Sequence, residues 1–121
     1  MHRILTAVAA AAALALTLTG CTGAASEPIA VTEDMTVIDV RTAQEYAQGH
    51  LDGAVSLDVT GGELAAAIPS LDPEAEYLVY CRSGNRSAQA VRQLEDAGFT
   101  AVTALGSMTE AAEATGIAVV R

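Results

Sequence analysis

A strand, a short polar loop and a helix follow one another in the middle of the chain, and this order restricts the fold most. Residues 77–81 (YLVYC) are apolar and lie between Asp72-Pro73-Glu74 and a Ser83-Gly84-Asn85 turn, which is typical of a strand buried on both faces. Residues 88–94 have apolar positions at helical spacing, and Ser87 is expected to be their N-cap. Because open α/β sheets bind ligands at the carboxyl ends of their strands, the sequence predicts a site at the end of the YLVYC strand.

Cys81 is the residue at that strand end, and its surroundings favour the thiolate. Loop N–H groups, the positive end of a helix dipole and the guanidinium groups of Arg82 and Arg86 would all lower its pKa. The same donors would hold an anionic substrate. The alternative is that Cys81 packs as a small buried hydrophobe. The turn and the two arginines favour the reactive cysteine, since core packing needs neither.

The other segments alternate between strand and helix. Residues 36–41 predict a strand, after which Thr42 and Glu45 fit a capping box and Gly49 ends the helix. Later segments predict a turn leading to a short strand, a helix, a strand and a last helix, at 50–57, 63–68, 100–105 and 108–114. Residues 28–32 are interpreted as a short edge strand, because Pro28 suits only an edge. The alternation predicts a single α/β domain with a mostly parallel sheet of about five strands flanked by helices.

Two segments together resemble the rhodanese family of sulfurtransferases. The first is the loop, a cysteine followed by four residues and an arginine, Cys81 to Arg86. The second runs from Asp39 and Arg41 through Glu45-Tyr46, Gly49-His50-Leu51 and Gly53-Ala54, in the order and spacing of the family's first signature. The resemblance spans about residues 28–120. It implies the rhodanese fold, with Asp39 and Arg41 bracing the architecture under the loop and His50 in a structural turn.

The resemblance implies a sulfur-transfer reaction. The Cys81 thiolate would take the outer sulfur of a small anionic donor such as thiosulfate, become a persulfide, and pass the sulfur to cyanide or a thiol. No metal or organic cofactor is implied. The substrate-binding loop would consist of Arg82, Ser83, Gly84, Asn85, Arg86 and Ser87.

Two other functions remain open. One is a sulfur carrier or protein-binding module at a membrane that does not turn over. The other is a related phosphatase or arsenate reductase. In those enzymes five residues separate the cysteine from the arginine, and here Ser87 stands at that position, so the loop length favours sulfur transfer.

The start of the chain has the pattern of an export signal. Met1-His2-Arg3 is a positive lead, and residues 4–19 are apolar and too short for a spanning helix. Residues 18–21 (LTGC) resemble the bacterial lipobox, which implies lipid on Cys21. We therefore expect a lipoprotein signal peptide over 1–20, a tether over 21–27 and the rhodanese-like domain over 28–121, anchored by lipid on the extracytoplasmic side of the membrane. The alternative is an ordinary signal peptide or an anchor helix with an incidental cysteine.

The charge of the chain excludes one class of partner. With 15 acidic and 6 basic residues and no lysine, its formal net charge is −9, which makes it a poor candidate for binding nucleic acid. The acidic residues have no metal-ligand spacing, so we expect no metal site.

Overall fold

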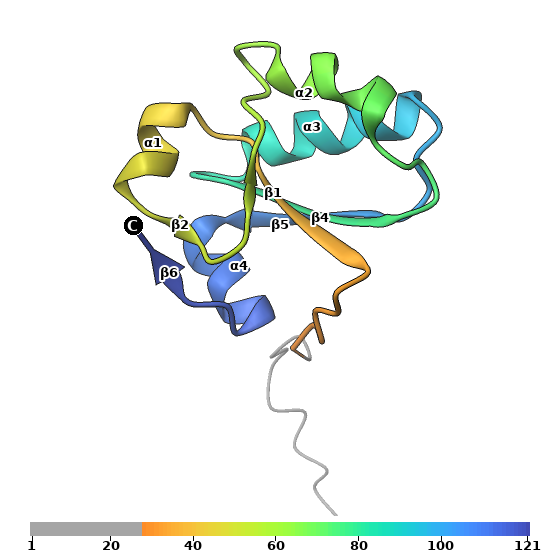
Figure 1. Cartoon of the computed structure of the whole chain (residues 1–121). Coiled ribbons are helices and arrows are strands. Elements are labelled where there is room, and N and C mark those ends of the chain that lie inside the picture. The colour runs from red at the N-terminus through yellow and green to blue at the C-terminus, as the bar shows by residue number, and fades with distance from the viewer. Residues whose placement is uncertain (1–27) are drawn as a thin grey trace, which may run out of the picture.

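The computed structural model describes residues 28–121, so the predicted signal peptide, the tether and Cys21 lie outside the described residues. Four parallel strands form the main sheet in the order β3-β1-β4-β5, and β2 pairs with β6 in a separate antiparallel ribbon (Figure 1). The elements in chain order are β1 (Met35–Asp39), α1 (Ala43–Gln48), β2 (His50–Leu51), β3 (Val55–Ser56), α2 (Glu63–Ala67), a 3₁₀ turn (Ile68–Ser70), β4 (Glu76–Cys81), α3 (Asn85–Asp96), β5 (Val102–Ser107), α4 (Met108–Thr115) and β6 (Val119–Val120).

The sheet has a hydrophobic core on each face. Side chains of β4 alternate between the two cores, as successive residues of a strand must. Val79 and Cys81 belong to the core beneath α2 and α3, whereas Leu78 and Tyr80 belong to the core beneath α4. The prediction of a strand buried on both faces is therefore confirmed, because Tyr77 through Cys81 are all buried.

The first helix begins and ends where the sequence predicts. Thr42 accepts a hydrogen bond from the Glu45 N–H at 3.1 Å, and a Glu45 carboxylate oxygen accepts one from the Thr42 N–H at 3.3 Å. Gly49 is the C-cap of α1. This capping box fixes the position of Glu45, which becomes important in the site.

The α/β fold with a mostly parallel sheet is confirmed, but two local predictions are wrong. The sheet has four strands instead of about five, because residues 28–32 form no strand. The Ile29 N–H bonds instead to the Ala114 carbonyl at the end of α4, at 2.7 Å, and Ile29 and Val31 pack on the core beneath that helix. Residues 50–51, expected in a turn, form β2, because β6 supplies a partner strand.

No helix within residues 28–121 is long and apolar enough to cross a bilayer.

Candidate active site

Cys81 is the last residue of β4, and its side chain is fully buried at the point where the chain turns toward α3. The Gly84 N–H donates a hydrogen bond to the Cys81 Sγ at 2.9 Å. Gly84 has a φ of +95°, in the left-handed region that favours glycine. That backbone geometry turns the N–H inward, so the loop presents a donor to the thiol.

The helix begins earlier than expected, and the prediction of Ser87 as N-cap is wrong. Gly84 is the N-cap of α3, and Ser87 lies buried in the first turn. Its hydroxyl donates to the Gly84 carbonyl at 2.9 Å. Because the helix starts at Asn85, the loop closes tightly, and the N-terminal N–H groups of α3 face the thiol.

These contacts determine the acidity of the thiol. Burial by itself raises the pKa of Cys81, but hydrogen bonds from Ser87, Gly84 and Ser83 outweigh burial. The pKa of the thiol therefore lies below its usual value, as expected for a cysteine that serves as a nucleophile. Backbone N–H groups supply most of these bonds.

The two loop arginines have different environments. The Arg86 guanidinium forms a bidentate ion pair with Glu45 of α1, with distances of 2.7 and 3.0 Å, and both side chains are about three-quarters buried. Arg86 is the main reason that the pKa of Glu45 falls to about 2. Arg82, in contrast, is exposed and lines a cavity beside the loop. The remaining loop residues Ser83 and Asn85 are also exposed.

Asp39 and Arg41 form a buried ion pair at the end of β1. The Arg41 Nη2 donates to the Asp39 Oδ2 and to the Gly49 carbonyl, each at 2.6 Å, and the Arg41 N–H donates to the Asp39 Oδ1 at 2.9 Å. The Arg41 guanidinium carbon lies 5.7 Å from the centre of the Tyr80 ring. The pair thus ties β1 to β4 next to Cys81 and to the end of α1.

His50 makes contacts of a structural kind. Its Nδ1 lies 2.9 Å from the Tyr46 carbonyl, and its ring stacks on the Tyr46 ring with centroids 3.7 Å apart. Residues 28–121 contain no group of three His, Cys, Asp or Glu side chains that could hold a metal ion.

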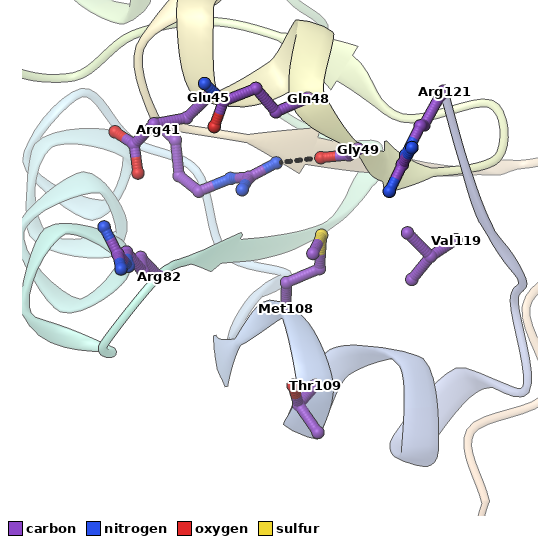
Figure 2. A pocket seen from close by; sticks show the side chains of 9 residues that line it. All are labelled: Arg41, Glu45, Gln48, Gly49, Arg82, Met108, Thr109, Val119 and Arg121. Atoms are coloured by element: carbon purple, nitrogen blue, oxygen red, sulfur yellow. Dashed lines mark hydrogen bonds between the residues drawn. The ribbon is translucent and has the colours of Figure 1, made fainter.

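A cavity of about 430 Å³ lies at the carboxyl ends of the strands, beside the loop (Figure 2). It is lined by Arg41, Glu45, Gln48, Gly49, Arg82, Met108, Thr109, Val119 and Arg121. The structure thus brings together Arg41 and Arg82 from the predicted site with residues from the start of α4 and from the end of the chain.

A model of the rhodanese-like domain matches residues 25–114, most of the chain. This chain belongs to the rhodanese-like domain family. YtwF of Bacillus subtilis, provisionally named a sulfurtransferase, is 36% identical over 87 residues, which cover 72% of this chain and 82% of YtwF. The thiosulfate sulfurtransferase PspE of Escherichia coli is 34% identical over 77 residues, which cover 62% of this chain and 72% of PspE. Among solved structures, the rhodanese-like domain of Alr3790 from Anabaena has 30% identity and a TM-score of 0.63, and the match covers 72% of this chain and 99% of that one.

Sequence reasoning missed two residues of this rhodanese-like domain's site. The sequence places Glu45 in a helix cap and in the family's first signature, but nothing in the sequence indicates that Glu45 pairs with Arg86, 41 residues away. Arg121 follows a short apolar run and belongs to no motif. The only feature of the sequence that singles out Arg121 is its positive charge, because the chain has only 6 basic residues.

Proposed function

We propose that the protein is a sulfurtransferase that carries the transferred sulfur as a persulfide on Cys81. The observation that supports this most directly is the hydrogen bond from the Gly84 N–H to the Cys81 Sγ, in a loop where burial and backbone donors meet on one thiol. Because relatives in this family are named thiosulfate sulfurtransferases, sulfur transfer is the first activity to test.

The first step forms the persulfide. The Cys81 thiolate attacks the outer sulfur of thiosulfate, a bond forms between the two sulfurs, and the sulfur–sulfur bond of thiosulfate breaks so that sulfite leaves with its electron pair. The loop N–H groups that hold the thiolate would then hold the negative charge of the outer sulfur. Cyanide or a thiolate attacks that sulfur in the second step, and Cys81 leaves again as the thiolate.

The intact mass of the full chain tests this proposal, with a mild detergent present to keep the apolar N-terminal segment in solution. We expect the wild-type chain to gain one sulfur atom from thiosulfate and to lose it to cyanide, whereas Cys81→Ser gains none. Sulfur that is gained but not released would indicate the carrier function. A folded, reduced wild-type chain that gains no sulfur would contradict both.

Hydrolysis of a phosphoester by the wild-type chain would instead support the related phosphatase. The loop argues against that function, since Ser87 stands where the wider loop would need its arginine, and the Ser87 side chain is buried in the first turn of α3.

We further propose that residues 1–20 are a lipoprotein signal peptide and that lipid on Cys21 anchors the domain, residues 28–121, on the extracytoplasmic side of the membrane through the tether 21–27. The pattern of residues 1–21 supports this. Metabolic labelling with a fatty acid should mark the wild-type chain but not Cys21→Ser. Equal labelling of the two chains would contradict it.

A further inference from the structure

The cavity beside the loop has an unusual charge for this protein. The chain has 15 acidic and only 6 basic residues, yet three of those basic residues, Arg41, Arg82 and Arg121, line this one cavity. They come from the end of β1, from the loop and from the residue after β6. A local concentration of positive charge on a strongly acidic chain favours an anionic ligand at this place.

Two of the three arginines have no ion-pair partner among the residues that the structure describes. Arg41 is held by Asp39 and by the Gly49 carbonyl, and the one acidic side chain that lines the cavity, Glu45, pairs with Arg86. Neither Arg82 nor Arg121 forms an ion pair within residues 28–121. These two guanidinium groups are therefore the cations left to bind an anion, and each can bind a carboxylate in a bidentate manner.

Apolar side chains lie in the same cavity. Figure 2 shows Arg82 and Arg121 on different sides of it, with Met108 between them and Val119 close to Arg121. Val119 is 50% exposed, so this apolar residue is accessible to a ligand in the cavity. The surface thus offers a cationic group on each side and hydrocarbon in the middle.

The volume argues for a ligand larger than thiosulfate or cyanide. At about 430 Å³ the cavity falls within the range of about 300–1,000 Å³ that is typical of sites for small organic molecules. Arg82 directly follows Cys81 in the chain, so this space adjoins the reactive loop. An organic molecule bound here would have one end near the loop.

We propose that this cavity binds the sulfur acceptor, an organic thiol that carries a carboxylate. The carboxylate lies against the guanidinium group of Arg121, the carbon chain covers Met108 and Val119, and the thiol end lies toward Arg82 and the loop. This inference rests on the proposed sulfur transfer, and it adds the chemical class of the sulfur acceptor. The acceptor thiolate attacks the outer sulfur of the Cys81 persulfide, a new sulfur–sulfur bond forms on the acceptor, and Cys81 leaves as the thiolate.

Transfer rates to matched thiols test this. The full chain, in detergent, is loaded with sulfur from thiosulfate, and its transfer to mercaptopropionate and to mercaptoethanol is measured at equal thiolate concentrations. The ratio of the two rates is the preference for the carboxylate. We expect Arg121→Gln to lower this ratio at least about fivefold, because a charge-assisted hydrogen bond is lost. Raising the salt concentration should lower the wild-type ratio as well.

Arg92→Gln is the matched control. It removes the same charge from an exposed position of α3 that does not line the cavity, and the ratio should stay at the wild-type value. A ratio that falls equally in Arg92→Gln and Arg121→Gln would reflect net charge alone and would overturn the subsite.

A binding measurement separates this inference from the proposed function. Methylthiopropionate has the carboxylate but cannot accept sulfur, and its binding can be followed by calorimetry. We expect binding to wild type and Arg92→Gln, and binding at least about fivefold weaker to Arg121→Gln. A chain that loads sulfur while Arg121→Gln changes neither ratio nor binding would overturn the subsite and leave the proposed function intact. A wild-type chain that takes no sulfur would overturn the proposed function and the acceptor assignment with it.

Discussion

Replacing Asp39 by Asn should destabilise the domain strongly while changing its shape very little. Asp39 is fully buried and its carboxylate is bonded to the Arg41 side chain and N–H. The amide would keep one acceptor but turn an N–H₂ group toward the guanidinium, and the buried cation would lose its counter-charge. Breaking one side of a buried pair costs about 3–5 kcal/mol. Because Arg41 keeps its bond to Gly49 and its contact with Tyr80, we expect about 3 kcal/mol.

Urea unfolding and thermal melting measure this loss. At about 4–8 °C per kcal/mol for a domain of this size, the melting temperature should fall by at least about 12 °C. Asp52→Asn makes the same chemical change at an exposed turn, and its stability should stay within about 0.5 kcal/mol of wild type. A loss below about 1 kcal/mol for Asp39→Asn, the value of a surface pair, would refute the reasoning.

A double-mutant cycle tests whether the loss belongs to the pair. Arg41→Met also leaves one buried charge alone, whereas Asp39→Asn with Arg41→Met leaves none. The double variant should therefore be more stable than the sum of the single losses predicts, by at least about 1 kcal/mol. Additive losses would show that the two side chains act independently.

The remaining predictions concern the loop and its supporting ion pair. Gly84→Ala should cost about 1–3 kcal/mol of stability, because alanine is strained at this positive φ. The same change should shift the Gly84 N–H away from the thiol and raise the pKa of Cys81, which can be measured from thiolate absorbance as a function of pH. An unchanged thiol pKa would contradict the donor role of the Gly84 N–H. Ser87→Ala should raise the same pKa by removing the hydroxyl, and an unchanged or lower value would count against that bond. The pKa of Glu45 is lowered, chiefly by Arg86, from 4.5 to about 2, so its contribution to stability is complete above pH 4.5 and disappears as the pH falls toward 2. Glu45→Gln should flatten the fall of stability over that pH range, and an unchanged acid profile would refute the assignment.

The sequence predicts the parts of the fold that depend on local patterns. The capping box of Thr42 and Glu45 lies within one helical turn, and the end of α1 needs only a glycine. The buried strand at 77–81 is readable because both of its faces are apolar. The place of Cys81 follows from this strand and the turn after it.

Other features depend on contacts between distant residues. The partner of Arg86 lies on α1, and the partner of β2 is the last strand, so neither can be read from its neighbours in the chain. Ser87 looks like an N-cap by residue type, but the positive φ of Gly84 starts the helix earlier. Arg121 enters the site only because β6 folds back along β2.

The shortness of the β2–β6 ribbon gives the domain two regions of unequal local stability. Only two residue pairs join these strands, His50 with Val120 and Leu51 with Val119, whereas β1 and β4 share five. Local opening requires less free energy where fewer contacts break, so the amide of Val120 should exchange its hydrogen faster than those of β4. The β2–β6 ribbon, which positions Arg121, can then open and close while β4, which carries Cys81, stays folded. A ligand bound in the cavity against this ribbon would slow that exchange, so the exchange rate of β6 amides would report whether the cavity is occupied.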